Sequence, residues 1–513
     1  MKLFKKTLVL ALASGAMLFM GTGCNDYIDI DVENTLAVDE IDYTIADDMY
    51  KPVIGCYGRM RSTGIHWALG MLWSGRDDDM CSGRTNDQAD ALKFGYHGGY
   101  QNPTVFWSVP LMWTNMYNII FDCNSNLATL DRFGENLTPG TADHNKYLSY
   151  IGEIKTIRAW AYYHLATFFG PCVIYASSDQ TSFRRSTVEK VYDYIIADLE
   201  SAIPFMEAKR PNQMEHMGAY TKYTAEALAA RVALLKGDYA KVKDFTDDII
   251  NNGGFSLYSD YYQLFKIPGK LCDESLMEVQ VSDFGNAMGD YIGIDQWFNY
   301  QGASVKDLVN NKSTAGWLFM RYHPAFLQWA DDRGETVRRE TSFLVAGEYT
   351  REQYIINGTP PKRDADGRLN VEAATSADIP QIYNGKAYLP INQMTGTATT
   401  WGRNNNVRVI RYAEVLLMNA EAKVRLGQNG DAPFNEVRQR AEMPRITNVT
   451  VDDILDERRM ELCSEWGLRY TDLCRTGLAK SVLGKYGWTE SKRFVDIPSS
   501  HVLTTPELAE DPI

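Results

Sequence analysis

The sequence lacks the short motifs by which enzymes and metal sites are usually identified. No two of its eight cysteines have the CxxC spacing of a zinc or redox motif. No GxSxG or HExxH string is present, so neither a serine hydrolase nor a zinc peptidase is indicated. No spacing singles out the carboxylate pair that glycoside hydrolysis needs. We therefore predict a protein that is not an enzyme and that needs no metal or cofactor.

Basic residues are fewer than acidic residues. The chain has 52 Lys and Arg against 66 Asp and Glu, a formal net charge of −14. The first 23 residues hold three lysines and no acidic residue, so the remainder lies near −17. Nucleic acids are bound through basic patches, so no nucleic-acid partner is predicted. Aromatic residues make up 12% of the chain, and a surplus of exposed rings would suit stacking on carbohydrate.

Long apolar runs are absent after the N-terminus. The run TLVLALASGAMLFM at 7–20 follows three lysines and is shorter than the ~20 residues of a membrane-spanning helix. Small residues follow it, as in a secretory signal, and GTGC at 21–24 is similar to a lipoprotein cleavage site, although Gly21 stands where leucine is usual. We predict a signal peptide over 1–23, acylation of Cys24 and a polar tether over 24–41. The alternative for the apolar run is a buried N-terminal helix. The other seven cysteines are expected to be mostly buried apolar residues.

Apolar residues at steps of three and four predict several helices. The stretch 147–169 has one such face and is stopped by Gly170-Pro171. Ser186 and Glu189 have the form of a capping box that opens a helix to about Ile203. Further helices are predicted near 42–61, 107–130 and 451–465.

Two stretches of about 30 residues each predict a helix pair. In 224–254, Thr224 is expected to cap the first helix, Gly237-Asp238 to form the turn, and five alanines to allow close approach. A similar pair is predicted over 411–441. Such pairs are typical of tetratricopeptide-type repeats, which must stack to bury their apolar faces. Between them, residues 255–400 are loop-rich, and Met277, Val279 and Val281 alternate with polar residues as in a strand.

Four strings in sequence order resemble the SusD/RagB family of outer-membrane nutrient-binding lipoproteins. They are YIGEIKTIRAWAYYHLATFFG, RYAEVLLMNAEA, ILDERRMELCSEWGLRYTDLCRTG and FVDIPSSHVLTTPEL. One departure is Glu465-Trp466-Gly467, where many members have Glu-Gly directly.

The resemblance implies a mostly α fold, a tetratricopeptide-like superhelix of about four helix pairs with a loop-rich ligand-binding excursion carrying short strands. We assign 42–254 and 401–513 to the helical parts, with a loop at 62–106, and 255–400 to the excursion. The resemblance also implies a lipid-anchored protein on the outer membrane that faces the cell exterior. Its partner would be a SusC-like TonB-dependent transporter, and its ligand an oligosaccharide or, less often, a peptide or other nutrient.

The resemblance implies ligand contacts in the early loop and in the excursion, and Trp401 and Arg403 lie just before the helix at Arg411. Aromatic rings there can stack on sugar faces while nearby Asp, Asn or Arg groups bond the hydroxyls. The candidates are Trp67, Trp73, Asp77, Tyr291, Trp297, Tyr300, Trp401 and Arg403.

Two charged clusters allow a functional and a structural interpretation. The string RDDD at 76–79 suggests calcium or catalytic carboxylates, but adjacent side chains diverge and the alternating donors of a calcium loop are missing. We predict a solvated loop there. The string ERRME at 457–461 is interpreted as a structural ion-pair network. Two other functions stay open, a surface glycoside hydrolase and a tetratricopeptide-type peptide-binding scaffold.

Overall fold

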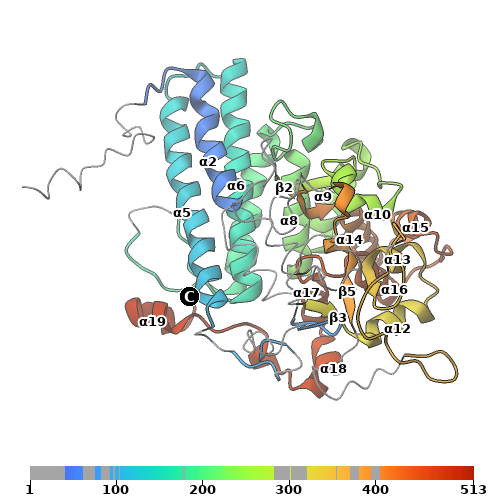
Figure 1. Cartoon of the computed structure of the whole chain (residues 1–513). Coiled ribbons are helices and arrows are strands. Elements are labelled where there is room, and N and C mark those ends of the chain that lie inside the picture. The colour runs from blue at the N-terminus through green and yellow to red at the C-terminus, as the bar shows by residue number, and fades with distance from the viewer. Residues whose placement is uncertain are drawn as a thin grey trace, which may run out of the picture. The chain divides into compact units, whose positions relative to one another are not determined.

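Helices dominate the computed structural model of the chain (Figure 1). The structure describes residues 41–61, 75–82, 93–95, 99–102, 104, 106–176, 180–281, 301, 320–353, 355–369, 381–393 and 405–513. The helices of the first half are α2 (Tyr50–Arg61), α5 (Ser108–Gly134), α6 (Ala142–Phe168), α7 (Val188–Ala202), α8 (Lys222–Lys236), α9 (Tyr239–Asn252) and α10 (Tyr261–Leu264). Those of the second half are α12 (Pro324–Asp332), α13 (Val337–Ser342), α14 (Tyr412–Arg425), α15 (Asp431–Arg440), α16 (Val451–Glu461), α17 (Leu468–Arg475), α18 (Ala479–Leu483) and α19 (Ser499–Thr504).

The strands are few and short. They are β1 (Met80–Ser82), β2 (Ser275–Val279), β3 (Met320–Tyr322), β4 (Phe343–Val345), β5 (Ile382–Asn384) and β6 (Val407–Arg411). They form three two-stranded antiparallel sheets, β1–β3, β2–β6 and β4–β5. The predicted class, mostly α with short strands, is confirmed.

The helices pack largely in chain order, as stacked helix pairs do. Figure 1 shows α2, α5 and α6 side by side, and each of α5 to α8 contacts the helix that follows it. Helix α9 then packs on α14, which contacts α15 and α16. The two predicted pairs are therefore present as α8–α9 and α14–α15, and the alanines of α8 are fully buried.

Helix α6 is buried on more sides than its sequence pattern predicts. Its last two turns and most of its middle are buried around the whole circumference, because α2, α5, α7 and α8 all pack against it. The apolar stripe in 147–169 therefore identified the helix correctly but showed only one of its contact faces.

Three helix ends differ from the prediction. Helix α7 is capped by Thr187 rather than Ser186, since the Thr187 side chain accepts from the Lys190 N–H. Helix α8 starts at Lys222, and its N-cap is Thr221, three residues before Thr224. The Thr224 hydroxyl instead donates to the Leu276 carbonyl at 2.7 Å, so it fastens α8 to β2.

Helix α16 ends at Glu461, four residues before the predicted end. Ser464, Trp466 and Gly467 have φ values of 57°, 52° and 67°, which an α-helix does not tolerate. The unusual step at Glu465-Trp466-Gly467 is thus a left-handed turn into α17.

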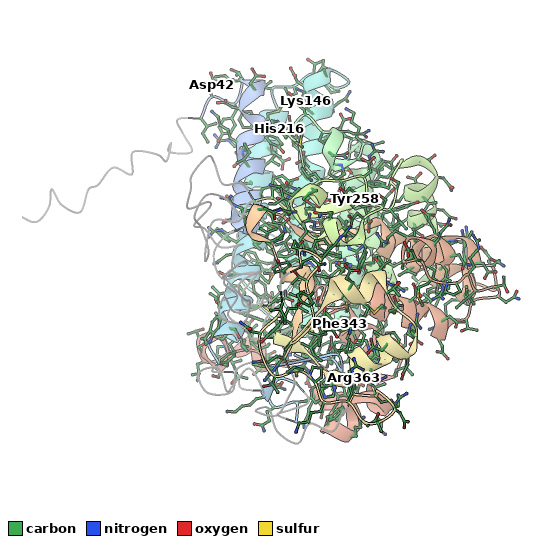
Figure 2. The ribbon with its side chains drawn as sticks, turned by 45° about the vertical axis from the view of Figure 1, so that its right-hand side comes forward. Asp42, Lys146, His216, Tyr258, Phe343 and Arg363 are labelled. Atoms are coloured by element: carbon green, nitrogen blue, oxygen red, sulfur yellow. The ribbon has the colours of Figure 1, made fainter. Side chains whose placement is uncertain are left out.

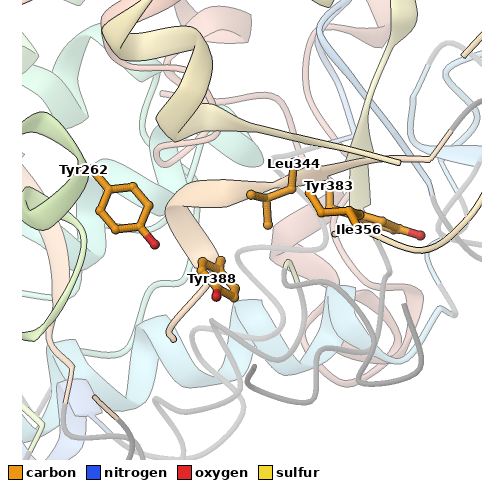
Figure 3. Packing of buried hydrophobic residues seen from close by; sticks show 5 residues of the cluster. All are labelled: Tyr262, Leu344, Ile356, Tyr383 and Tyr388. Carbon is orange, nitrogen blue, oxygen red and sulfur yellow. The ribbon is translucent and has the colours of Figure 1, made fainter. Parts of the chain in front are cut away.

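Strand β2 lies inside the predicted excursion 255–400 and pairs with β6, which follows the excursion in the chain. β2 lies antiparallel to β6, with Val279 opposite Val407. The predicted strand is present, but all five residues of β2 are buried, so the alternation does not mark an exposed face. Within the excursion, Tyr262, Leu344, Ile356, Tyr383 and Tyr388 form a separate buried cluster (Figure 3).

The seven described cysteines are free, and five of them are buried, as expected for small apolar residues. Among the described helices, none is long and apolar enough to cross a membrane.

Candidate functional site

Most of the predicted ligand residues lie outside the described part of the chain. Trp67, Trp73 and the five candidates in 291–300 and 401–403 belong to segments that the structure does not describe, as does Cys24. Asp77 alone is described. The ligand contacts assigned to all of these residues stay predictions. The structure does describe the residues at which several of their segments begin and end.

The start of segment 282–300 and the end of segment 394–404 are held together by hydrogen bonds. Val281 directly precedes 282–300, and its N–H donates to Asn406 Oδ1 at 2.8 Å. Asn406 lies two residues after the segment that contains Trp401 and Arg403. The Asn406 amide also donates to Glu278 and Gln280, at 2.7 Å each. One buried asparagine therefore joins the end of β2 to the start of β6.

A groove of about 290 Å³ lies between these positions and α2. Its lining runs along α2 from Tyr50 to Arg61, the last residue before the 62–74 loop, and reaches Gln280 near the end of β2. We call this cavity, with its third wall at 216–220, the α2 groove. It adjoins the starting points of segments 62–74 and 282–300.

Aromatic rings form much of the α2 groove. Tyr50 and His216 stack with centroids 3.6 Å apart and planes 7° from parallel, and Figure 2 labels His216 close to α2. Tyr57 meets Tyr220 edge to face at 4.9 Å. Tyr50 and Tyr57 are two helical turns apart, a spacing that is typical of an ordinary core face, so a groove could not be predicted from it.

A buried carboxyl group fixes the tyrosines of the groove. Glu153 on α6 accepts from the Tyr57 hydroxyl at 2.8 Å and from the Tyr50 hydroxyl at 3.2 Å. The Tyr57 oxygen in turn accepts from the Tyr220 N–H at 2.7 Å. Burial raises the pKa of Glu153 to about 8, although the two hydroxyl bonds favour the ionised form. Glu153 is therefore protonated at neutral pH and joins α2, α6 and the 216–220 segment.

Replacing Glu153 with glutamine is expected to make the protein more resistant to alkaline conditions. The pKa of Glu153 is raised from 4.5 to about 8, so folding stability falls as pH rises through that window, because the unfolded chain ionises first. The loss amounts to about 3 kcal/mol by pH 7, at about 1.4 kcal/mol per pKa unit. Glutamine has no such proton to lose. Chemical denaturation of both proteins at pH 5, 7 and 8.5 measures the difference.

The free-energy gap between Glu153→Gln and wild type should widen in favour of the variant as pH rises. The exposed Glu207, which forms a surface ion pair with Lys209, supplies the control variant Glu207→Gln. A gap for Glu153→Gln that stays constant across the three pH values would show that Glu153 is already ionised in the folded protein.

The 76–79 loop is buried, so the prediction of a solvated loop was wrong. Asp77 and Asp79 are 5% and 2% exposed. Asp77 Oδ1 accepts from the N–H groups of Asp79 and Met80 at 2.9 and 3.0 Å, and burial followed by the charges of Asp79 and Asp78 raises its pKa. Arg459 and Arg469 bind Asp79 and Asp78 from α16 and α17. These arginines lie far away in the sequence, which is why the local pattern suggested exposure.

The cluster at 457–461 is an ion-pair network, as predicted. Glu457 accepts from Arg338 at 2.6 Å and from Arg438 at 2.8 Å. Glu461 accepts from Arg411 at 3.0 Å and also from Arg440. In the part of the chain that the structure describes, no group of three or more His, Cys, Asp or Glu side chains is arranged to hold a metal ion.

Comparisons with known proteins agree along nearly the whole chain. A family model described as the SusD family matches residues 251–506, and one described as "Starch-binding associating with outer membrane" matches 96–234. A SusD-like protein of Bacteroides ovatus is 24% identical over 497 residues, which are 92% of this chain and 82% of that protein.

Solved structures share the fold at lower identity. Surface glycan-binding protein A of Bacteroides thetaiotaomicron, solved with laminarihexaose, has a TM-score of 0.70 and 20% identity, over 90% of this chain and 98% of that one. A laminarin-binding SusD-like protein has a TM-score of 0.72 and 22% identity, over 90% and 97% of the two chains. With the two family models covering separate parts of one helical fold, the chain belongs to the SusD/RagB family.

Proposed function

We propose that this protein is a cell-surface lipoprotein that captures an oligosaccharide and passes it, chemically unchanged, to a SusC-like TonB-dependent transporter in the outer membrane. The observation that carries the proposal is the similarity, over nine-tenths of the chain, to proteins named for glycan binding. The family description that includes association with the outer membrane supports the location.

The geometry supports a binding role for the two loop segments. Segment 62–74 follows α2 and segment 282–300 follows β2, and the α2 groove adjoins both departure points. Loops on a rigid scaffold are where binding residues concentrate. A neutral sugar offers rings and hydroxyls rather than charge, so the predicted tryptophans and tyrosines match it by stacking.

The carboxylates of the 76–79 loop and of α16 are paired with arginines. Asp78 and Asp79 are bound by Arg459 and Arg469, and Glu457 and Glu461 by other arginines. A glycosidase needs one protonated and one ionised carboxyl facing each other across a substrate cleft. Carboxylates that are occupied by guanidinium groups are poorly suited to that role, which favours binding without turnover.

Glycan retention without product formation tests the proposal. Purified protein lacking residues 1–24 is incubated with neutral oligosaccharides, including laminarihexaose and maltohexaose, while binding is followed by calorimetry and products by chromatography. We expect saturable binding of at least one glycan and no shortened product. Shortened products would indicate a glycoside hydrolase. Binding of peptides but of no glycan would indicate a peptide-binding scaffold.

Cys24→Ala is expected to move the protein from the membrane fraction to the soluble fraction. Each acyl methylene buried in a membrane contributes about 0.8 kcal/mol, and the variant loses all of them. Fractionation of cells that express the full chain, followed by immunoblotting, measures the shift. Cys272→Ala is the control, since Cys272 is a half-buried cysteine of the body. Equal membrane retention of both variants would contradict the anchor.

A further inference from the structure

A second aromatic cavity of about 350 Å³ opens beside α5 and shares no lining residue with the α2 groove. We call it the α5 pocket. α5 contributes Trp113, Tyr117 and Phe121 at steps of four, so they lie on one face of the helix. The opposite walls come from the segment after α6, which supplies Tyr175 and Phe183, and from the C-terminal region around α19. Figure 1 shows α19 and the C-terminus near one end of α5.

The backbone next to the α5 pocket is held in place by side-chain hydrogen bonds. The Tyr117 oxygen accepts from the Val173 N–H at 2.8 Å and donates to the Val173 carbonyl at 3.2 Å. Asn124 donates to the Tyr175 carbonyl at 2.8 Å, and the Tyr162 hydroxyl accepts from the Tyr175 N–H at 2.8 Å. The rings of this wall are therefore positioned before a ligand arrives, which lowers the entropic cost of binding.

The C-terminal wall is fastened in the same way. The Ile513 N–H donates to the Arg185 carbonyl at 2.9 Å, and the Thr187 N–H donates to the Ile513 carbonyl at 3.2 Å. The Arg185 guanidinium donates to the Glu510 carbonyl at 2.8 Å. Residues 507–513 thus pack along the segment that carries Phe183, and the two together close one side of the pocket.

The described residues of the lining carry rings and uncharged polar groups, and none of them is Asp, Glu, Lys or Arg. Trp113 and Tyr117 lie 4.9 Å apart, and the rings of Tyr175 and Phe183 are within 13° of parallel at 6.3 Å. Thr114 Oγ1 is 3.1 Å from His501 Nε2, and burial lowers the pKa of His501, so this ring is neutral at pH 7. These lining residues suit an uncharged ligand with apolar faces for the rings and polar edges for the threonine and histidine.

We propose that the α5 pocket binds a neutral pyranose unit of a glycan, as a second site apart from the predicted loop site. A pyranose presents C–H faces to aromatic rings and hydroxyls at its edge, and 350 Å³ lies within the range of small-molecule pockets. Phe121 is 50% exposed at the rim, where an incoming sugar would cover it. The choice of a glycan rests on the proposed function, whereas the site does not.

Single-residue variants at matched exposure test the site. Phe121→Ala removes the rim ring, and Phe205→Ala removes a ring that is 54% exposed and lies outside the pocket lining. Saturation-transfer NMR titrations use methyl β-glucoside and methyl β-galactoside as neutral probes, and glucuronate as the charged probe. We expect Phe121→Ala to weaken binding of a neutral probe at least fivefold and Phe205→Ala to leave it unchanged. Glucuronate should bind at least fivefold more weakly than the neutral probes, because none of the described lining residues is a cation.

The outcomes separate this proposal from the proposed function. Adding the Trp67→Ala, Trp297→Ala double variant to the titrations shows which site each probe uses. If that double variant abolishes binding and Phe121→Ala does not weaken it, the loop site stands and the α5 pocket proposal is overturned. If wild type binds hexasaccharides but Phe121→Ala weakens the binding of no neutral probe, the pocket proposal is again overturned. Loss of transporter co-purification in Phe121→Ala, with unchanged probe binding, would assign the pocket to a protein contact instead. Thermal midpoints equal to wild type verify that both alanine variants are folded.

Discussion

Arg411→Ala is expected to lower the free energy of unfolding by about 3–5 kcal/mol, the scale for removing one partner of a buried ion pair. Arg411 is 1% exposed and donates to Glu274 at 2.5 Å, to Glu461 at 3.0 Å and to Glu465 at 2.8 Å. Alanine would leave three buried carboxylates facing one another with less compensating charge. Equilibrium denaturation in urea measures the loss.

The control for Arg411→Ala is an ion pair of similar geometry at the surface. Arg368 is bound to Asp332 at 2.7 Å, but the two side chains are 56% and 45% exposed. Arg368→Ala should cost less than about 1 kcal/mol. If the two variants are equally destabilised, the network around Arg411 contributes no more than a surface pair.

The same network determines how the protein responds to acid. Burial alone would raise the pKa of Glu465, but Arg411 and Lys386 outweigh it and lower that pKa to about 2. A lowered carboxylate pKa gives stability that is present above the unfolded value of 4.5 and is lost as pH falls toward 2. Arg411→Ala should therefore show a shallower loss of stability between pH 4.5 and 2 than wild type.

Trp67→Ala and Trp297→Ala are each expected to weaken glycan binding about tenfold or more. Removing a stacked ring costs about 1–3 kcal/mol, the scale of burying an aromatic side chain, and each 1.4 kcal/mol is tenfold in affinity. If the two rings contact different sugar units, their effects add, and the double variant should lose about a hundredfold. Calorimetry with whichever hexasaccharide the wild type retains gives the values.

Tyr349→Ala is the control for the tryptophan variants, because Tyr349 is 66% exposed and lines neither of the two cavities. It should bind the glycan as wild type does. If Trp67→Ala and Trp297→Ala also bind as wild type does, the ligand lies elsewhere, and the α5 pocket becomes the first place to look.

Local sequence patterns predicted the helices well because helix formation is a local event. The pairs α8–α9 and α14–α15 follow from apolar periodicity and a glycine at each turn. The caps at Thr187 and Thr221 were missed by one and three residues, since several nearby hydroxyls could serve equally well. Tertiary contact decided between them, as the bond from Thr224 to the Leu276 carbonyl illustrates.

Charged clusters and cavities were predicted less well, because their partners are distant in the chain. Asp79 and Arg459 are 380 positions apart, so nothing beside Asp79 indicates that it is neutralised and buried. The rings of the α5 pocket are spaced by four along α5, which also describes an ordinary core face. Only the position of the C-terminal segment shows that they line a cavity.

The pairing of β2 with β6 bears on how relatives of this protein can diverge. A stretch of chain that departs and returns at neighbouring strands can change length without moving α8 or α14, which carry those strands. The entropic cost of closing a loop grows only slowly with the length of the loop, by about 0.6 kcal/mol for each doubling. The boundary lies where Val279 pairs with Val407 and Val281 bonds to Asn406. Insertions and deletions between these two positions therefore change the free energy of folding little. The chain on one side of that boundary can therefore change in length and sequence while the helical scaffold on the other side is kept.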